Sequence, residues 1–376
     1  MRGIFFSEDF AIESGVYKKI IQEIQAFHNK GLHIELKMDQ KKKFIWKMLK
    51  RFPLFSIQNK LFNIEEIPSD IDFVYIRKPF AIDFSFYKTS KKIKKQNPNI
   101  KMILEIPTYP YDKENKYIKN KNYMLLSKDK FWRKRLKGLV DRIVTYSDDE
   151  IIFDIKTIRV SNGVDFSILP IKKRNFSPLG SEVNLIAVAT LSFWHGYDRL
   201  IEGIAKYNKS LLRQNTQVKL HIVGEGEQEI IDHYTQLIED NNLAESVILH
   251  GQKIGQALDE VFEISDIAID SLGRHRSGIF YNSSLKGKEY VARGLPVVSG
   301  VETELDDYPS YKYYFRVPAN DSFIDIKGIL NFYEKVLIEE SSEQIKMNIR
   351  NFGQSHFNMD EVFQPIIKYL LEPKKQ

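Results

Sequence analysis

The sequence predicts an α/β protein with two doubly wound domains, and three observations support this. Short apolar segments alternate with amphipathic segments along most of the chain, which is typical of parallel sheets covered by helices on both faces. The length of 376 residues corresponds to about two domains. The turn-forming Asn162 and Gly163, followed by Pro170 and a polar stretch, indicate a joint. We therefore expect domains at 1–170 and 171–376, with the last helix as a candidate for packing back on the first domain.

Five strands are expected in the first half. They are short apolar runs bounded by helical or polar segments, and they cover residues 3–7, 32–38, 72–77, 101–107 and 142–147. Residues 16–29 are expected to form a helix, because Ile20, Ile24 and Phe27 fall on one stripe. The segment 40–64 fits the pattern poorly, and we interpret it as an insertion.

The second half repeats this order. Strands are expected at 184–190, 220–224, 247–250, 267–271 and 296–299, and helices at 197–207, 228–241, 257–264 and 284–293. Gly294 and Pro296 directly follow the last of these helices and are ordinary stop signals. Doubly wound domains bind ligands at the carboxyl ends of their strands, so we expect a ligand cleft between the two domains.

Composition excludes several classes of protein. The chain is 43% hydrophobic, which is too apolar for a disordered protein, and it has no cysteine for disulfides, thiolate zinc sites or a cysteine nucleophile. It contains no apolar run of about 18 residues and no signal peptide pattern, so we expect a cytoplasmic protein. Residues 1–170 carry 33 basic and 21 acidic side chains, whereas residues 171–376 carry 23 and 29. The positive charge therefore belongs to the first half.

The most informative segment is residues 283–298, with the sequence SSLKGKEYVARGLPVV. Small residues at a helix start allow a ligand to approach the exposed amides, which bind anions such as phosphate. Glu289 lies about one turn inside, where a carboxylate can accept both hydroxyls of a ribose. The alternative is a serine-capped helix with a solvated glutamate.

This segment resembles the signature of retaining GT-B glycosyltransferases of family 4, the glycosyl transferases group 1. Further segments resemble that family in the same order along the chain: RIVTYS at 142–147, VSNGVD at 160–165, VATLSFWHGYDRL at 188–200, HIVGEG at 221–226, VILHG at 247–251 and SDIAI at 265–269. The resemblance implies two Rossmann-like domains that face a central cleft. It also implies a nucleotide-sugar donor, which we expect to be a UDP-sugar, on the second domain and an acceptor on the first.

Carried over by position, the resemblance gives a set of donor-binding residues. Glu289 is expected to bind the ribose, and the helix start at Ser283, Ser284, Leu285 and Lys286 the diphosphate. The remaining positions line the base pocket or the diphosphate cleft: Gly15, Thr190, His195, Arg199, Gly224, Gly251, Gln252 and Lys253.

The sequence departs from the family pattern at three positions. Tyr281 stands where the first of two glutamates is expected, Thr190 replaces the usual diphosphate-binding arginine, and His195 the usual lysine. Since negative charge builds on the departing diphosphate and no metal or other cofactor is expected, other groups must stabilise it. We favour Arg199 and Lys286 for this role, with the run Arg274–His275–Arg276 as a further source of cations.

The acceptor and catalytic groups are expected in the first domain. Glu105 ends a predicted strand where the family often places a group near the reacting sugar, so Glu105 and Glu289 are the predicted catalytic carboxylates. Arg77 and Tyr109 are the other predicted acceptor-binding residues. Each has a structural alternative as an ordinary strand-end or loop residue. Asp70 and Asp72 imitate a metal motif, but we interpret them as structural and expect no metal.

Two basic segments interleave cations with large apolar side chains, at residues 41–52 (KKKFIWKMLKRF) and 131–135 (FWRKR). This pattern is typical of interfacial segments on anionic membranes. We therefore expect peripheral attachment at the inner face of a membrane and a glycan or lipid-linked acceptor, as in bacterial surface polysaccharide synthesis. A solvated lysine-rich surface is the alternative.

Other functions remain open at this point. A sugar-nucleotide 2-epimerase would need acid and base carboxylates beyond Glu105 and Glu289. A non-catalytic GT-B partner of another transferase would explain Tyr281. Nucleic-acid binding has no recognisable reader motif in its favour, and we expect none.

Overall fold

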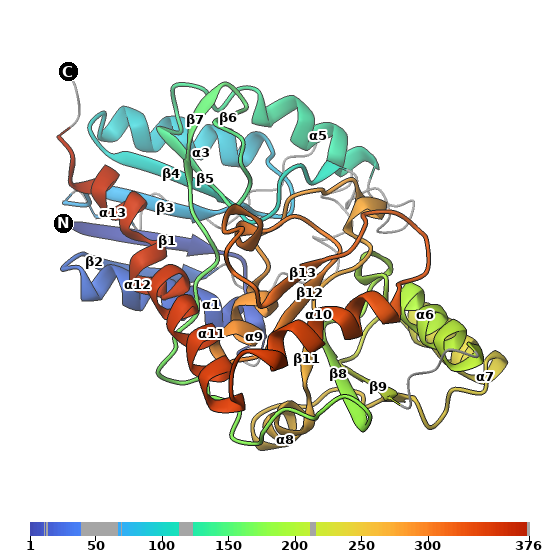
Figure 1. Cartoon of the computed structure of the whole chain (residues 1–376). Helices are drawn as coiled ribbons and strands as arrows, with labels where there is room; N and C mark the ends of the chain where they lie inside the picture. The colour runs from blue at the N-terminus through green and yellow to red at the C-terminus, as the bar shows by residue number, and fades with distance from the viewer. Residues whose placement is uncertain are drawn as a thin grey trace. The chain divides into compact units, whose positions relative to one another are not determined.

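The computed structural model describes residues 1–10, 12, 14–38, 67–68, 70–112, 123–210 and 216–373. The chain forms two compact units (Figure 1). Unit 1 comprises Met1–Ser161 and Met359–Gln376, and unit 2 comprises Asn162–Asn358. The change of unit therefore comes upstream of residue 170, and the two short C-terminal helices belong to the compact unit of the N-terminal strands.

Unit 1 is built on a sheet whose described strands have the order β2-β1-β3-β4-β5-β7-β6. All neighbours pair in parallel except the hairpin β6–β7. The strands are β1 (Arg2–Ser7), β2 (His33–Met38), β3 (Phe73–Arg77), β4 (Lys101–Ile106), β5 (Arg142–Thr145), β6 (Ile151–Ile152) and β7 (Ile155–Arg159). β3 and β4 are buried along their whole length, as expected for central strands covered on both faces.

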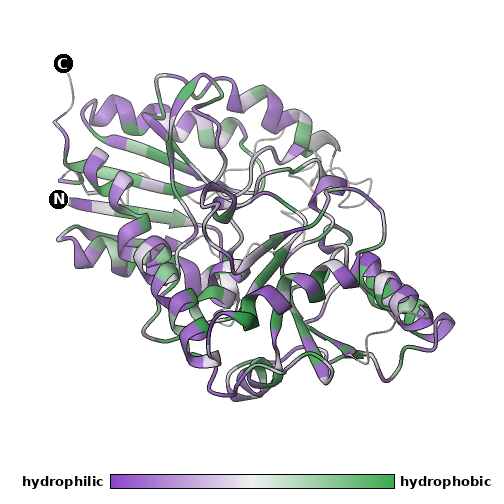
Figure 2. Ribbon diagram, in the orientation of Figure 1, coloured by the Kyte–Doolittle hydropathy of each residue, from purple (hydrophilic) through white to green (hydrophobic). Residues whose placement is uncertain are grey.

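Helices cover both faces of this sheet. They are α1 (Gly15–Asn29), α3 (Phe84–Gln96), α5 (Tyr123–Arg133), α12 (Met359–Val362) and α13 (Gln364–Leu371). Alternate strand residues divide the core into two clusters. The cluster under α1 includes Phe27, Phe73 and Phe363. In Figure 2 the strands are largely hydrophobic, whereas the outer surfaces of the helices are hydrophilic.

Unit 2 repeats this architecture with a fully parallel sheet in the order β10-β9-β8-β11-β12-β13. Its strands are β8 (Glu182–Val188), β9 (Gln217–Val223), β10 (Val247–Leu249), β11 (Ile267–Ile269), β12 (Val297–Ser299) and β13 (Tyr314–Arg316). Its α-helices are α6 (Tyr197–Lys209), α7 (Gln228–Asp240), α8 (Gln256–Ile264), α9 (Leu285–Ala292), α10 (Ile326–Ile338) and α11 (Ser342–Phe357).

The ten strands expected from the sequence are present within a few residues of their predicted bounds. The strands β6, β7 and β13 were not predicted: β6 has only two residues, and β7 and β13 are mostly not buried and contain charged side chains, so they lack a continuous apolar run. The predicted insertion at 40–64 lies outside the described residues.

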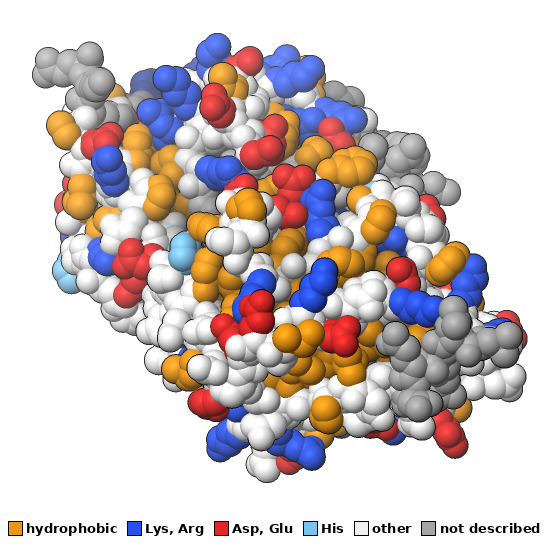
Figure 3. All heavy atoms as spheres, in the orientation of Figure 1, with side chains coloured by type: hydrophobic (Ala, Val, Ile, Leu, Met, Phe, Trp, Pro, Cys, Tyr) orange, Lys and Arg blue, Asp and Glu red, His pale blue; other side chains and the backbone are white. Residues whose placement is uncertain are grey.

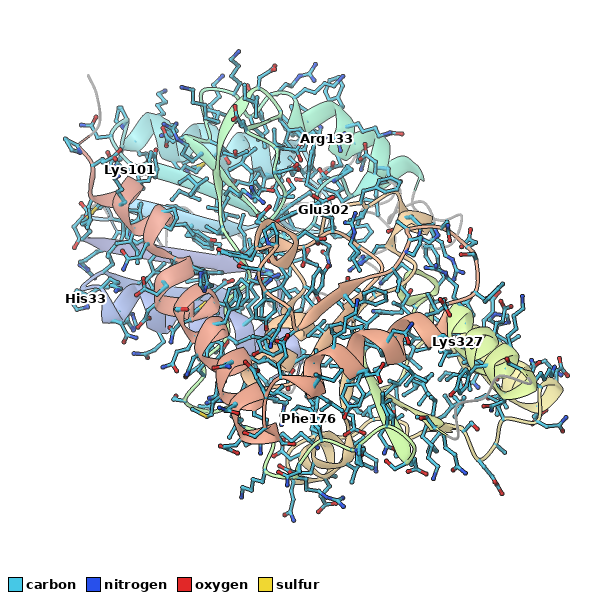
Figure 4. All side chains as sticks on the ribbon, in the orientation of Figure 1. His33, Lys101, Arg133, Phe176, Glu302 and Lys327 are labelled. Carbon is cyan, nitrogen blue, oxygen red and sulfur yellow. The ribbon has the colours of Figure 1, made fainter. Side chains whose placement is uncertain are left out.

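A buried lysine holds the C-terminal helix α13 against the sheet of unit 1 (Figure 4). Lys101 Nζ donates to the carbonyl oxygens of Tyr369 at 2.8 Å and Leu370 at 2.7 Å, and also to that of Glu372. These are carbonyls of the last helical turn, which have no partner within the helix. The ammonium therefore caps α13 and also favours its negative dipole end.

Replacement of Lys101 by Met should destabilise unit 1. The variant keeps the aliphatic stem but loses charge-assisted bonds, each typically contributing about 1.5–3 kcal/mol. We expect the variant to unfold at lower urea concentration and to lose its C-terminal residues faster to carboxypeptidase. Lys92→Met on the exposed side of α3 is the matched control. Equal behaviour of the two variants would contradict the capping role.

Candidate functional site

The topology of unit 2 reverses between two neighbouring strands. From β8 the chain continues outward through β9 and β10, and it then returns to the other side of β8 with β11. Such a switch point leaves a crevice at the carboxyl ends of the two strands, where doubly wound sheets bind their ligands. The residues that follow β8 and β11 are therefore the first candidates for a site.

Asp270, the residue that directly follows β11, organises this position. Its side chain is buried, and its Oδ1 accepts a hydrogen bond from Ser284 Oγ at 2.8 Å. Lys286 Nζ lies 3.4 Å from the same oxygen and donates to Tyr197 Oη at 3.2 Å. Ser284 also caps α9 by accepting from the Gly287 amide at 3.2 Å. One carboxylate thus fixes the start of α9 and the ammonium beside it.

The electrostatics of this position favour an anionic ligand. The first amides of α9 have no partner within the helix and carry its positive dipole end. Burial lowers the pKa of Lys286 to about 8, against the opposing effect of Asp270. Its side chain is 17% exposed, so Lys286 lies close to the surface of unit 2.

His195 supplies a hydrogen-bond donor at the same place. Burial lowers its pKa well below the ordinary value, and the charges of Lys286 and Arg274 lower it further. The imidazole is therefore neutral. Its Nδ1 accepts from the Ser192 amide at 3.0 Å, which leaves the proton on Nε2. The predicted residues His195, Ser284 and Lys286 are thus brought together, whereas Asp270 was not predicted.

The loops after β8, β9 and β10 are joined by backbone hydrogen bonds. The Leu191 amide donates to Glu225 O at 2.7 Å, and the Gly224 amide donates to Gly251 O at 2.8 Å. A side chain at Gly224 would place its Cβ 1.8 Å from Ala189 O, so only glycine fits. The predicted Thr190, Gly224, Gly251, Gln252 and Lys253 therefore lie in adjacent loops.

A histidine pair that was not predicted supports the loop at Gly251. His221 Nδ1 lies 2.9 Å from His250 Nε2, and His221 Nε2 lies 2.9 Å from Asn184 Oδ1. Burial lowers the pKa of His221 to about 4 and also lowers that of His250. Both rings are thus neutral at pH 7 and join β8, β9 and the end of β10.

The remaining predicted residues of α9 have internal partners. Glu289 lies 3.2 Å from Arg293, which also pairs with Asp259 at 2.7 Å. Ser283 Oγ accepts from the Asn162 amide at 2.7 Å. Leu285 is the first residue of the helix. The Glu289 side chain is 29% exposed, so it can still meet a ligand.

The structure does not place Arg199 in its predicted role as a cation for the donor diphosphate. Its guanidinium donates to the carbonyl oxygens of Ser322 at 2.7 Å, Pro318 at 3.0 Å and Leu272. The residue is only 1% exposed. Such a side chain cross-links backbone segments and does not present a cation to a donor diphosphate.

Most of the basic run that follows β11 is also engaged internally. Arg276 makes a bidentate pair with Asp198 at 2.9 and 2.7 Å, and His275 Nε2 lies 3.1 Å from Asp321. Arg274 lies over the Trp194 ring at 5.5 Å and is partly exposed. Lys286 and Arg274 are therefore the cations that the structure favours near the start of α9.

In unit 1, the predicted Glu105 and Arg77 belong to a buried network below α1. Arg77 Nη1 lies 2.8 Å from Glu105 Oε1, and Tyr146 Oη donates to the same oxygen at 2.9 Å. Lys19 Nζ lies 3.3 Å from Glu23 Oε1 and 3.7 Å from Glu105 Oε1. Glu105 and Glu23 are 0% exposed.

The structure does not place Glu105 and Arg77 in their predicted roles. Glu105 has no exposed surface and Arg77 is paired with it, so neither side chain is available to contact a sugar or an acceptor. Burial, together with the neighbouring Glu105 carboxylate, raises the pKa of Glu23 to about 7. We infer that Glu23 is partly protonated near neutral pH.

The other two predicted residues of unit 1 lie at the start of α1 and in the segment after β4. Gly15 begins α1 directly after its cap Ser14. Tyr109 follows β4 and packs edge-on against Tyr111 and Phe153, with ring centroids 6.4 and 5.9 Å apart. Tyr109 is partly exposed and remains a candidate for acceptor contact.

In residues that the structure describes, no three His, Asp or Glu side chains are arranged to hold a metal ion. Over the same ranges, no helix combines the length and apolarity that crossing a bilayer requires.

Comparison with known proteins identifies the fold. Residues 182–308 match the family model described as Glycosyl transferases group 1. A glycosyltransferase from Rickettsia africae has a TM-score of 0.64 and 14% identity, covering 100% of this chain and 99% of that one. This chain has the GT-B fold.

Two further GT-B structures are similar over almost the whole chain. HepE of Anabaena in complex with UDP has a TM-score of 0.58 and 12% identity, covering 98% of this chain and 99% of that one. The E. coli trehalose-6-phosphate protein bound with UDP-2-fluoro glucose has a TM-score of 0.62, 12% identity and the same coverage. No curated protein matches the chain in sequence.

The raised pKa of Glu23 predicts how stability depends on pH. Because the pKa of Glu23 is raised on folding, its favourable contribution is fully present below about pH 4.5 and is lost as pH rises through about 7. We expect Glu23→Gln to flatten the fall of the thermal midpoint between pH 5 and 8 by a few degrees. Glu361→Gln, an exposed substitution on α12, should leave the slope unchanged. An unchanged slope in Glu23→Gln would contradict the raised pKa of Glu23.

Proposed function

We propose that this protein is a GT-B glycosyltransferase that moves a sugar from a UDP-sugar to a glycan or lipid-linked acceptor with retention of configuration. The observation that carries the proposal is the arrangement of Asp270, Ser284 and Lys286 at the start of α9, with the neutral His195 close enough for the charge of Lys286 to lower its pKa. It combines helix amides, an ammonium and a neutral donor at the switch point. This is what the diphosphate of a nucleotide sugar requires.

The chemistry follows from where charge develops. Breaking the bond between the anomeric carbon and the diphosphate oxygen leaves negative charge on the diphosphate. Lys286 and the first amides of α9 would stabilise it, and His195 would donate a hydrogen bond without adding charge. In same-face transfer the departing phosphate takes the proton of the acceptor hydroxyl. The acceptor oxygen then bonds to the anomeric carbon on the face that the phosphate leaves.

The nucleoside part has its own candidates. The exposed loop at Gly251, Gln252 and Lys253 offers backbone groups to a base, and Glu289 a carboxylate to the ribose. We propose UDP because HepE binds UDP and the E. coli protein binds a UDP-sugar. We also propose a cytoplasmic enzyme of bacterial surface polysaccharide synthesis that needs no metal.

Tyr281 favours one alternative, a nucleotide-binding partner that does not transfer a sugar. In the structure this residue bridges to Glu302, so its backbone lies beside the segment after β12. A carboxylate expected to hold the donor sugar is replaced there by a phenol.

Calorimetry with UDP, GDP and ADP tests the proposal. We expect UDP to bind at least tenfold more tightly than the other two, which corresponds to about 1.4 kcal/mol. Binding together with slow hydrolysis of a UDP-sugar supports the transferase, and the anomeric configuration of the released or transferred sugar is read by NMR. Binding without any turnover favours the partner, and no binding of any nucleotide contradicts both.

Lys286→Met should weaken UDP binding about tenfold or more at pH 7, because a charge-assisted bond to the diphosphate is lost. Since burial lowers the pKa of Lys286 to about 8, the ammonium loses its charge as pH rises above that value. Wild-type affinity should therefore fall between pH 7 and 9 more steeply than that of Lys286→Met. The exposed Lys335→Met on α10 is the control. Parallel pH profiles would exclude Lys286 from the diphosphate site.

A further inference from the structure

A stripe of lysines runs along the exposed side of α3. The helix carries five lysines and no acidic residue. Four of them, Lys88, Lys91, Lys92 and Lys95, are exposed and follow helical spacing, so they lie on one side. The fifth, Lys94, is directed away to Asp141 and is not part of the stripe. In Figure 3, basic side chains gather at the top of the view, where Figure 1 places α3 and α5.

Exposed aromatic rings lie at one end of this stripe. Phe84, at the start of α3, is 42% exposed, and Phe131, near the end of α5, is 50% exposed. Trp132 joins them, with ring centroids 5.0 Å from Phe84 and 5.1 Å from Phe131. Single exposed apolar residues are ordinary, but rings in mutual contact form a patch.

More cations surround the rings. Arg135 lies over the Phe131 ring at 3.5 Å. Lys130, Lys134 and Lys137 are also exposed. Between residues 123 and 137 the only acidic side chain is Asp129, which is buried and binds the Ile82 amide at 2.8 Å. Outside this segment, Asp112 pairs with Arg133 at 2.7 Å and lies 3.9 Å from Lys130 Nζ, so the basic side chains of this side still outnumber the acidic ones.

We propose that this surface, formed by the exposed sides of α3 and the end of α5, binds an anionic lipid bilayer. The rings would enter the region of the headgroups, where aromatic side chains are favoured, and the lysines would remain in water above the phosphates. Each basic residue near such a surface adds to the electrostatic attraction. The proposal is independent of which nucleotide the protein binds.

Charge alone would also suit a nucleic acid, but two features favour the bilayer. The lysines lie on one straight stripe next to the rings, and the rings pack against one another at tilted or edge-on angles, which leaves no parallel gap for bases to enter. Cations beside exposed apolar side chains fit the plane of a membrane interface.

Vesicle flotation tests the proposal with the full-length protein. Vesicles of phosphatidylcholine alone are compared with vesicles that also contain phosphatidylglycerol, at low and at physiological salt. Wild type should float with the anionic vesicles only, and salt should weaken binding. Failure to bind anionic vesicles at low salt overturns the proposal.

Three variants separate the contributions of this surface. Lys88→Glu/Lys91→Glu/Lys92→Glu should weaken binding at least tenfold, and Phe84→Ser/Phe131→Ser should weaken it most at physiological salt, where the apolar contribution matters more. The control Lys206→Glu/Lys209→Glu/Lys335→Glu makes the same change of charge on exposed lysines of unit 2 and should bind as wild type. UDP calorimetry and circular dichroism check that each variant is folded.

Two outcomes would overturn the assignment. Equal loss in the α3 variant and the control would show that only net charge matters. Unchanged vesicle binding in the Phe84→Ser/Phe131→Ser variant, together with loss of single-stranded RNA binding in the α3 variant, would instead assign the surface to nucleic acid. A negative UDP experiment leaves this inference standing, because it concerns a different unit of the chain.

Discussion

The candidate site depends on one buried carboxylate. Asp270 directly follows β11, next to the point where the strand order of unit 2 reverses. Its Oδ1 accepts a hydrogen bond from Ser284 and lies 3.4 Å from the ammonium of Lys286. A buried carboxylate needs such partners to remain charged. Since Ser284 is also the cap of α9, the same interaction sets where the helix begins and where its amides point. Strand, helix start and cation are thus fixed together.

Unit 1 contains a buried network of a different kind. Lys19, Glu23, Arg77 and Glu105 pair with one another below α1 and expose almost no surface. Buried ion pairs contribute little net stability compared with apolar packing, but removing one partner is costly because the other charge is then left unpaired. The network therefore constrains how α1 lies on the sheet. A titratable residue at a strand end can thus have a structural role. Glu105 is paired within the buried network of unit 1, whereas Asp270 holds Ser284 and Lys286 at the candidate site of unit 2.

Much of the fold could be predicted because parallel strands and amphipathic helices leave periodic patterns in sequence. The helix α1 is an example, since Ile20, Ile24 and Phe27 mark its buried side. Glu23 lies on that same side, between Ile20 and Ile24, so a buried carboxylate was visible in the pattern. Arg199 had a similar signal, because it lies among buried residues of α6. For Glu23 and Arg199, the helical spacing indicated that the side chain is buried but not which residues it pairs with.

The site was predicted unevenly for a physical reason. Glycines at strand ends and the small residues before α9 are recognisable because the backbone requires them. At Gly224, for example, a Cβ would lie 1.8 Å from the carbonyl oxygen of Ala189. Asp270 and the pair His221 and His250 were missed, since an acidic residue after a strand or a histidine within one is common in any protein.

By itself the sequence determined the two doubly wound halves, most of their strands and the small residues at the start of α9. Only the tertiary structure decided which charged side chains pair inside the fold and which stay partly exposed near the start of α9. It paired Glu105 with Arg77 and directed Arg199 to backbone carbonyls. It also placed Lys286 beside Asp270 and His195. The reason is that burial and pairing arise between residues far apart in the chain, whereas local spacing records only which side of an element each residue occupies.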